Sequence, residues 1–422
     1  MSNKSRHKTY YEHQSLRLGE DLESGELKSL ESLFGKSKDF PYYSLIPRGI
    51  KLCEYVGVIQ VGKKVIEVLP KIDKNTDPDS GHWQHILIDM LKVVSGFNAR
   101  APGYSDLKLK SNTILEMYFE IFINEVEYLV RTGMVRKYHK DESNQNALKG
   151  RLIFSKQIQK NLVHQERFFT RNTVYDHEHV WHVILYQAIM LIKKLCKNAS
   201  LHSRIGQLEL TFPKMPGMQI CAKTFDRLIY NRQTERYKKA IEIARLLLLN
   251  YHPDIRSGHN NVLALMFNMN DLWERFVYCS LRKHLGPKGE YSLSAQKKHP
   301  FWVEERHGVQ IKPDLEVSNI ETKEKWIWDT KWKIPTNGTP SSGDLQQMYT
   351  YAGILQSRKV ALVYPGTSPQ ITGTFFNRQS DPPVSCSVIY IPAERSIPKW
   401  QENIYECFMA WAKVCELKDS PP

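Results

Sequence analysis

The sequence has 422 residues, of which 41% are hydrophobic and 25% charged, a composition typical of globular proteins with two or three cores. Its net charge of +14 predicts a polyanionic partner, most simply nucleic acid. No segment reaches the about 18 consecutive apolar residues of a membrane span, and the basic, polar start does not resemble a secretory signal. The seven scattered cysteines include no C-x-x-C pair, which favours reduced thiols in the cytoplasm over a disulfide framework or structural zinc.

The first part of the sequence combines a polar lead-in with a β-rich stretch. About 50 polar residues, with a helical pattern near Glu20–Phe34, are expected to form a segment with modest structure. Two β-rich runs then flank Gly62 and Lys63, which predicts a hairpin. Gly57, Gly62 and Lys63 also match the spacing of a phosphate-binding loop, but strand-forming residues separate the glycines and Lys64 replaces the required serine or threonine. We therefore expect this chain to bind no nucleotide itself.

The middle of the sequence is predicted to be mainly helical over residues 82–250. Apolar residues recur at helical spacing over His82–Val94, Thr113–Thr132 and Thr234–Asn250. Residues 134–154 interrupt this pattern with a polar, basic stretch that has too few apolar residues for a core element. This stretch is either a solvated loop or an arm that contacts a partner or DNA.

Residues 176–182, DHEHVWH, are rich in groups that bind metals. The H-E-x-x-H zinc motif is not met, because Trp181 occupies the position of its second histidine. His179 and His182 lie one turn apart where an apolar helix begins. We interpret them as polar residues of that helix rather than as metal ligands.

Two carboxylates near the C-terminal third are the main candidates for catalysis. Apolar and polar residues alternate over Val309–Val317, which predicts a strand, and a second strand begins at Trp326. A hairpin centred on Glu321–Thr322 would place Asp314 opposite Asp329, where two carboxylates repel unless a divalent cation such as Mg²⁺ lies between them. Lys331, two residues after Asp329, would point to the same face.

This set suits metal-assisted phosphodiester hydrolysis and resembles the PD-(D/E)xK nuclease motif. Gln347 and Tyr351 form a Q-x-x-x-Y pair on a predicted helix, which is similar to the RecB-like branch of that superfamily. Glu274 lies on an earlier helix where the superfamily often has an additional acidic ligand. Lys333 is a weaker alternative to Lys331, because it lies outside the D-x-K spacing. The competing interpretation is that Asp314 and Asp329 are solvent-facing residues of an ordinary antiparallel sheet.

Along most of its length the sequence resembles the McrC family, the nuclease subunits of McrBC-type, 5-methylcytosine-dependent restriction systems. The matching motifs are YVGVIQVGKKVIEVLPKI at 55–72, LKGRLIF at 148–154, NDLWERFV at 270–277, KPDL at 312–315, DTKWK at 329–333 and QMYTYA at 347–352. The resemblance implies an α/β protein with a C-terminal PD-(D/E)xK endonuclease domain. It also implies an N-terminal α+β region that docks on an AAA+ GTPase of McrB type, which reads and translocates modified DNA and whose NTP hydrolysis this subunit stimulates.

By that resemblance, the candidate residues take distinct roles. Asp314 and Asp329 would bind Mg²⁺ and Lys331 would be the catalytic lysine. Glu274 would be an accessory metal ligand or an orienting carboxylate, and Gln347 and Tyr351 would position the DNA strand or the metal shell.

A boundary near residue 256 would divide the chain into two functional parts. Residues 1–255, β-rich over 50–75 and helical over 82–250, form the predicted partner-binding region, and residues 256–422 form the endonuclease domain. Three functions remain open: a nuclease subunit of an NTP-dependent complex, a stand-alone RecB-like nuclease for repair or defence, and an inactive scaffold. The intact D…D-x-K set counts against the scaffold. The absence of a nucleotide loop favours the first function.

Overall fold

The computed structural model describes residues 7–35, 41–62, 64–70, 80–94, 114–252, 261–304, 308–333, 335, 339–376, 383–394 and 396–413, with only the backbone for 80–85. The chain divides into two compact units. A discontinuous unit comprises residues 1–58, 64–107 and 266–422, and a helical unit comprises residues 59–63 and 108–265. This division reflects compactness, and the predicted functional boundary near residue 256 stays a prediction.

The N-terminal strands form two sheets. The five-stranded sheet has the order β1-β6-β5-β11-β10, and the three-stranded sheet has the order β2-β4-β3. Their bounds are β1 His7–Tyr11, β2 Ser15–Arg17, β3 Tyr43–Ile46, β4 Gly49–Leu52, β5 Tyr55–Val61, β6 Lys64–Leu69, β10 Tyr251–His252 and β11 Val262–Asn268, with helix α1 at Ser24–Phe34. The expected hairpin is therefore present as β5 and β6, and Gly62 between them has a φ of 55°, which glycine adopts without strain.

The lead-in segment is more structured than the sequence predicted. Strand β1 pairs in parallel with β6, so that Tyr10 lies beside Val68 and is buried. Helix α1 buries Leu27, Leu30 and Leu33. The prediction of modest structure was wrong, because β1 is stabilised by a strand about 50 residues further along the chain, which the local sequence pattern does not reveal.

The helical unit contains most of the predicted helices. These are α3 Ile114–Arg131, α5 Val180–Leu195, α6 Ala199–Thr211, α7 Ala222–Asp226 and α8 Lys238–Leu249, the last preceded by a 3₁₀ turn at Glu235–Tyr237. The predicted helix at His82–Val94 is also present, as α2 at Ser80–Val94 in the discontinuous unit. Thr113, a predicted helix start, lies outside the described residues, whereas Gly133 follows the last turn of α3 with a φ of 86°, as expected of a terminator.

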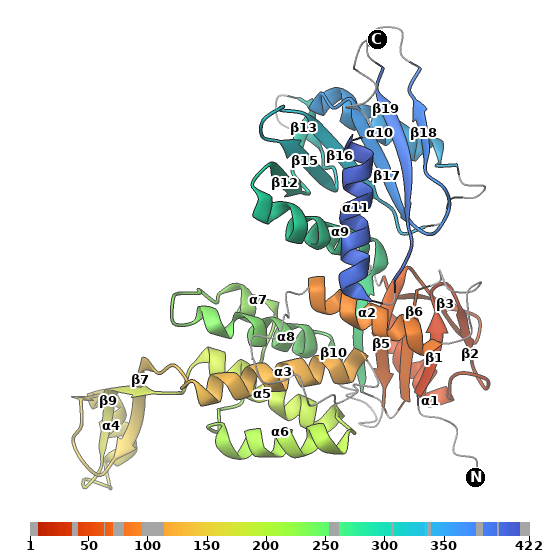
Figure 1. Cartoon of the computed structure of the whole chain (residues 1–422). Helices are drawn as coiled ribbons and strands as arrows, with labels where there is room; N and C mark the ends of the chain where they lie inside the picture. Colours follow the sequence, from red (N-terminus) through yellow and green to blue (C-terminus); the bar gives the residue numbers. More distant parts are fainter. Residues whose placement is uncertain are drawn as a thin grey trace. The chain divides into compact units, whose positions relative to one another are not determined.

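An arm extends from the helices of this unit (Figure 1). It consists of β7 Lys137–Gln145, β8 Arg151–Leu152 and β9 Phe168–Asp176, with helix α4 at Phe154–Asn161 near its end. Strand β7 pairs antiparallel with β9 over its whole length. Residues 137–145 are thus a paired strand and not a solvated loop, whereas a contact of this arm with a partner or DNA stays a prediction.

The C-terminal part is built on a six-stranded sheet of order β12-β15-β16-β17-β19-β18. The strands are β12 Tyr291–Ala295, β15 Leu315–Asn319, β16 Lys325–Thr330, β17 Lys359–Pro365, β18 Ile371–Thr374 and β19 Ser385–Ile391. Strands β16, β17 and β19 are mutually parallel and the others pair antiparallel. Strands β17 and β19 are thus interior strands of this sheet.

Helices cover both faces of this sheet (Figure 1). Helix α10, Ser342–Leu355, buries Met348, Tyr351, Ala352 and Leu355 against one face. Helices α9, Met269–Leu285, and α11, Ile397–Lys413, pack on the other face through aromatic rings. The ring centroids of Trp328 in β16 and Phe408 in α11 lie 5.2 Å apart, and both side chains are fully buried, so the aromatic side of α11 belongs to the core.

The strand predicted over Val309–Val317 is in fact two strands. β14, Gly308–Ile311, pairs with β13, His299–Val303, in a separate two-stranded ribbon, whereas β15 belongs to the main sheet. Lys312 and Pro313 separate them, because proline donates no ladder hydrogen bond and restricts the residue before it. In the part of the chain that the structure describes, every helix is too short or too polar to span a lipid bilayer.

Candidate active site

The hairpin register predicted for the two aspartates is the register observed. Leu315 pairs with Trp328 and Val317 pairs with Trp326, so the pairing is centred between Glu321 and Thr322. One step further along, Asp314 precedes β15 opposite Asp329, the fifth residue of β16. The sequence register therefore brings both carboxylates to one end of the hairpin.

Asp314 is held by hydrogen bonds from three donors. The amide N and the Oγ1 of Thr330 donate to its Oδ2, at 2.8 and 3.0 Å, and Nε2 of Gln296 donates to its Oδ1 at 3.2 Å. Burial raises the pKa of Asp314, although the Thr330 hydrogen bonds and the lysines Lys331 and Lys312 oppose that shift. The competing interpretation, in which the two aspartates face solvent, is not supported, since Asp329 is 1% exposed.

Asp329 carries the stronger electrostatic perturbation. Burial, with the neighbouring Asp314 carboxylate, raises its pKa to about 6, against the attraction of Lys331. Its Oδ2 lies 2.7 Å from Nζ of Lys331 and has no other hydrogen-bond donor among the described residues. A buried acceptor with one neighbour and a perturbed pKa is a candidate functional group.

Lys331 links the aspartates to helix α10. It follows β16 and its amide N donates to the carbonyl of Val363 in β17, which fixes its backbone against the sheet. Its Nζ also donates to Oε1 of Gln347 at 3.2 Å. Burial opposes the positive charge of Lys331, but Asp329 and Asp314 outweigh burial and raise its pKa. Lys331 is therefore fully charged at neutral pH.

Gln347 and Tyr351 extend this hydrogen-bond chain by one helical turn. Nε2 of Gln347 donates to the Tyr351 hydroxyl at 2.7 Å, and that hydroxyl donates to the carbonyl of Lys312 at 3.3 Å. The chain thus runs from Asp329 through Lys331, Gln347 and Tyr351 to the backbone beside Asp314. Their i, i+4 spacing on α10 is what allows both side chains to face the sheet.

Glu274, on α9, lies within electrostatic reach of the same group. Burial, followed by repulsion from Asp314, raises its pKa to about 7, while Gln296 donates a hydrogen bond that opposes the shift. Gln296 therefore bridges Glu274 and Asp314. All six predicted site residues belong to one continuous set of contacts.

Two neighbours of this set escaped the sequence analysis. Gln296 sits between β12 and β13 with a φ of 55°, a left-handed conformation that costs a non-glycine residue about 1 kcal/mol or more. Asp344 of α10 is buried, and burial favours its neutral form, but Nζ of Lys333 at 2.6 Å outweighs burial and lowers its pKa. Lys333 therefore neutralises Asp344 and leaves Lys331 as the lysine of the Asp329 group.

The donor set at this site fits Mg²⁺. Its candidate ligands, Asp314, Asp329 and Glu274, offer carboxylate oxygens, the hard donors that this ion prefers. The raised pKa values of all three show that their negative charge is poorly compensated by the surrounding protein. The Oδ2 atom of Asp329 is a buried acceptor with one cationic neighbour. A divalent cation bound here would compensate that charge.

Of the histidines in residues 176–182, His182 belongs to the core of the helical unit, whereas His177 and His179 are partly buried. His182 is fully buried; its Nδ1 lies 2.7 Å from the carbonyl of His177 and its Nε2 lies 3.1 Å from the Tyr237 hydroxyl. Burial and the nearby His179 lower the pKa of His182 to about 3. Both observations favour a neutral His182. It lies in the first turn of α5, where the sequence predicted a polar residue of the helix.

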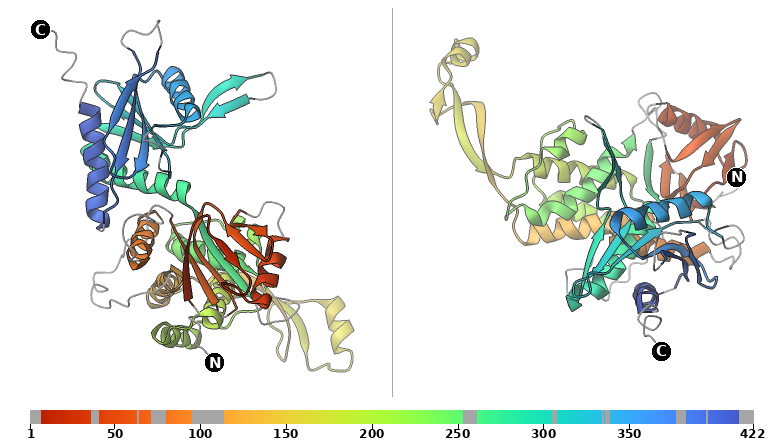
Figure 2. Two further views of the ribbon diagram at one scale, coloured as in Figure 1. Left: turned by 90° about the vertical axis from the view of Figure 1, so that its right-hand side faces the viewer. Right: turned by 90° about the horizontal axis from the view of Figure 1, so that it is seen from above.

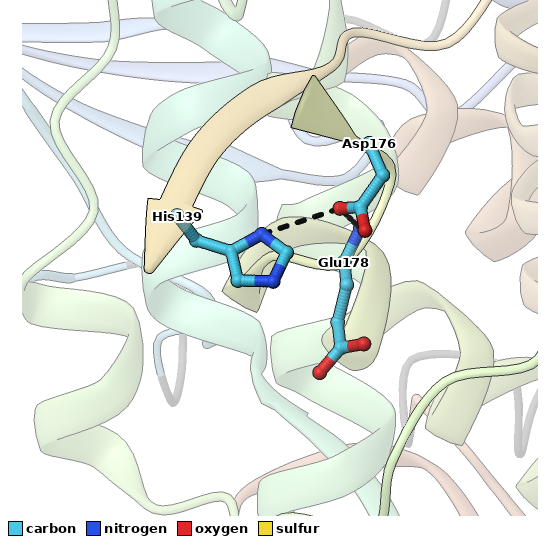
Figure 3. A group of neighbouring side chains, drawn as sticks. All are labelled: His139, Asp176 and Glu178. Atoms are coloured by element: carbon cyan, nitrogen blue, oxygen red, sulfur yellow. Dashed lines mark hydrogen bonds and ion pairs between the residues drawn. The ribbon is translucent and has the colours of Figure 1, made fainter. Parts of the chain in front are cut away.

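A different cluster of possible ligands lies where the arm begins (Figure 3). His139 of β7, Asp176 of β9 and Glu178 bring one ligand atom each within 4.8 Å of one another. Nδ1 of His139 lies 3.3 Å from Oδ1 of Asp176, which also accepts a hydrogen bond from the amide of Glu178. The close approach of His139 to Asp176 and the hydrogen bond from the Glu178 amide account for this partly exposed arrangement.

Comparison with known proteins identifies the family. A family profile described as "McrBC 5-methylcytosine restriction system component" matches residues 50–365. A search among curated proteins found no match.

Two solved structures are similar to the chain. The first is described as "Refined half-complex from tetradecameric assembly of Thermococcus gammatolerans McrB AAA+ hexamers with bound McrC"; the TM-score is 0.69 at 20% identity, over 96% of this chain and 100% of that chain. The second, a cryo-EM structure of the Thermococcus gammatolerans McrBC complex, has a TM-score of 0.48 at 21% identity over 66% and 88%. The first likeness shows a shared fold and confirms the predicted mixed α/β class. Because the profile spans most of the sequence, the chain belongs to the family of McrBC 5-methylcytosine restriction system components, and its predicted McrC resemblance is confirmed.

Proposed function

We propose that this protein is a Mg²⁺-dependent DNA endonuclease and the cleaving subunit of a modification-dependent, McrBC-like restriction complex that defends against foreign DNA. The observation that carries the proposal is the Asp314–Asp329–Lys331 group. Its two carboxylates meet across one hairpin, and Lys331 lies 2.7 Å from Asp329. The raised pKa of Asp329, to about 6, is typical of a carboxylate whose charge a cation is meant to balance.

In this proposal, Asp314, Asp329 and Glu274 hold the metal. When bound, Mg²⁺ supplies an activated water and stabilises the charge that develops on the phosphate. Thr330 and Gln296 fix the Asp314 carboxylate in one orientation. With its pKa near 7, Glu274 exchanges a proton at neutral pH, so it serves as an accessory ligand or an orienting carboxylate.

The remaining residues act on the substrate and the attacking water. Lys331 carries a positive charge at neutral pH and is positioned to orient the water and balance the phosphate charge. Gln347 and Tyr351 hold Lys331 in place through their hydrogen bonds and present polar groups to the DNA strand or the metal shell. Each of these contacts is preorganised, which is how a fixed site lowers a barrier without reorganising at the moment of reaction.

The proposed partner is an AAA+ GTPase of McrB type. The structure similar to this chain is described as McrB AAA+ hexamers with bound McrC. The sequence offers one candidate phosphate-binding loop, which starts at Gly57. Its residues Val58–Val61 lie in strand β5, as predicted, and therefore do not form such a loop. We therefore assign nucleotide binding to the partner, and partner docking with stimulation of its NTP hydrolysis to the N-terminal region. The complex would act in the cytoplasm, where the free thiols of the described cysteines stay reduced.

The test is Asp329→Ala in the full chain, assayed for cleavage of methylated DNA with Mg²⁺ and the cognate GTPase. Loss of a metal ligand should abolish cleavage while leaving partner binding and the melting temperature near those of the parent protein. Glu321→Ala, which removes an exposed carboxylate from the turn of the same hairpin, is the matched control and should cleave normally. Normal cleavage by a folded Asp329→Ala protein would refute the assignment.

A stand-alone RecB-like nuclease is the second candidate. It is favoured by the completeness of the group: every predicted site residue lies in α9, α10 or β16, or directly beside β15 or β16. This function requires cleavage by the chain and Mg²⁺ alone, at a rate that the GTPase does not change. The same assay run without partner and GTP distinguishes the two functions.

A further inference from the structure

The β13–β14 ribbon, formed by His299–Val303 and Gly308–Ile311, leaves the main sheet at the candidate active site. Gln296 precedes it and Asp314 follows it. The amide N of Gln296 donates to the carbonyl of Asp314 at 3.1 Å, and their side chains are also hydrogen-bonded, so both ends of the ribbon are joined at a proposed metal ligand. His299 at the ribbon base pairs with Glu316 of β15 at 2.5 Å. The base of the ribbon is therefore part of the candidate active site.

The ribbon projects from the six-stranded sheet (Figure 2). It also exposes large apolar side chains. Phe301, Trp302, Val303 and Val309 are 51, 53, 74 and 53% exposed. An isolated two-stranded hairpin is only marginally stable in water, and exposed apolar clusters of this kind mark interaction sites. Among the described residues, neither the Phe301 ring nor the Trp302 ring packs against another aromatic ring. These side chains are too exposed to belong to a hydrophobic core, and a binding surface explains their exposure.

A β-bulge sets the direction of these aromatic side chains. Pro300 pairs with Gln310 but Trp302 pairs with Val309, so Phe301 is an extra residue with no partner across the ribbon. A bulge breaks the alternation of faces, increases the local twist and re-aims side chains, and bulges are common beside active sites. Here it places two aromatic residues next to each other in a ribbon only two strands wide.

Positive charge flanks the apolar surface on the side of the catalytic group. Lys297 and Lys298 directly precede the ribbon in the sequence and Lys312 directly follows it, and all three are exposed. No ion pair of the described residues neutralises Lys297 or Lys298. A protein partner with an apolar docking site would not require these charges, whereas phosphates on both sides of a groove would.

We infer that the β13–β14 ribbon is a DNA-binding element, which lies in a groove of the duplex and holds the scissile phosphate at the Asp314–Asp329 group. Phe301 and Trp302 contact sugars and bases, and Lys297, Lys298 and Lys312 contact phosphates. A two-stranded ribbon has the width of a B-DNA groove, and apolar side chains act as wedges between base steps. This inference rests on the proposed nuclease function, because it takes the nuclease substrate as the ligand.

The experiment measures duplex binding by the full-length protein, by fluorescence anisotropy of a labelled 30-base-pair DNA at low salt. Ca²⁺ replaces Mg²⁺ in this binding assay so that the DNA stays uncut, and cleavage with Mg²⁺ and binding of the GTPase are measured separately for each variant. Aromatic contacts to bases contribute about 1–3 kcal/mol each, so Trp302→Ala and Phe301→Ala should each weaken binding about fivefold or more. Both side chains are about half exposed, so their removal should leave the fold intact, and melting temperatures check this directly.

The matched control is Ile371→Ala, which removes an exposed apolar side chain from β18, at the opposite edge of the six-stranded sheet. It should bind DNA as the parent protein does. Asp329→Asn, measured alongside, reports on the catalytic group independently, since it should lose cleavage and keep binding.

The possible outcomes separate the inference from the proposed function. Weakened binding and cleavage by Trp302→Ala, with a normal control, supports the ribbon as a DNA contact. If both aromatic variants bind and cleave DNA normally while Asp329→Asn loses cleavage, the inference about the ribbon is refuted and the proposed nuclease function is retained. If the aromatic variants bind DNA normally but no longer bind the GTPase, the ribbon contacts a protein partner instead of DNA, and the inference is refuted. Absence of any DNA binding by the parent protein overturns both.

Discussion

Replacing Asp329 by asparagine removes one buried negative charge with little change of shape, and the structure predicts that the metal-free protein gains stability. Burial and Asp314 raise the pKa of Asp329 to about 6, roughly two above the ordinary value of an aspartate. At about 1.4 kcal/mol per pKa unit, the ionised form opposes folding by up to about 3 kcal/mol at pH 8. Because the pKa of about 6 already includes the attraction of Lys331, we expect a net gain of up to about 3 kcal/mol.

The same pKa shift determines how the stability difference between the two proteins changes with pH. A carboxyl whose folded pKa is raised contributes full stability below its unfolded pKa and loses that contribution as the pH rises through its folded pKa. The parent protein should therefore lose stability relative to Asp329→Asn between about pH 4 and pH 6, and the difference should be constant above that window. Below pH 4 the two proteins should converge.

The assay is thermal unfolding at pH 4, 6 and 8 in the presence of a chelator, repeated with Mg²⁺. For a domain of this size each kcal/mol shifts the melting temperature by about 2–4 °C, so the gain is measurable. Mg²⁺ should stabilise the parent protein and leave Asp329→Asn nearly unchanged, because only a bound ion shifts the folding equilibrium. Glu321→Gln is the control. An Asp329→Asn protein that is less stable than the parent at pH 8 without metal would refute the electrostatic argument.

Three further predictions follow from other parts of the chain. DNA binding by the full chain should weaken steeply between 50 and 200 mM salt, since phosphate contacts release counterions, and a flat affinity would argue against a direct DNA role. A fragment of residues 1–268, which keeps β11 in its sheet, should bind the GTPase and raise NTP hydrolysis without cleaving DNA, whereas stimulation by residues 269–422 alone would reverse this division of labour. Because burial lowers the pKa of His182 to about 3, the free energy of unfolding, measured with urea, should fall as the pH drops below about 6.5. His182→Gln should lack this fall, and a variant with the same pH dependence as the parent protein would show that His182 does not cause it.

The candidate site was largely predictable because its determinants are local. The turn between β15 and β16 and the apolar residues on either side fix the register, and the register alone brings Asp314 and Asp329 together. The spacing of Gln347 and Tyr351 on one helix likewise follows from helical geometry. The chemical role of this group remains a prediction.

What the sequence did not reveal depends on contacts between distant segments. Strand β1 looked like a polar lead-in, since its side chains gain a partner only when β6 pairs with it. Asp344 carries no motif, and its position beside Lys333 depends on how α10 packs on the sheet. Gln296 owes its place to a left-handed backbone conformation that its residue type does not favour.

The position of β11 has a consequence for how the chain folds during synthesis. Strand β11 lies beside β5 in the five-stranded sheet, yet roughly 190 residues separate it from β6, the strand that follows β5. At about 5–20 residues per second, a ribosome needs roughly 10–40 s to complete that interval. Throughout this time the apolar strand β5 has an unpaired edge, which is a template for association with other nascent chains. The intervening helical unit can fold first, so its speed sets how soon β11 arrives to close that edge.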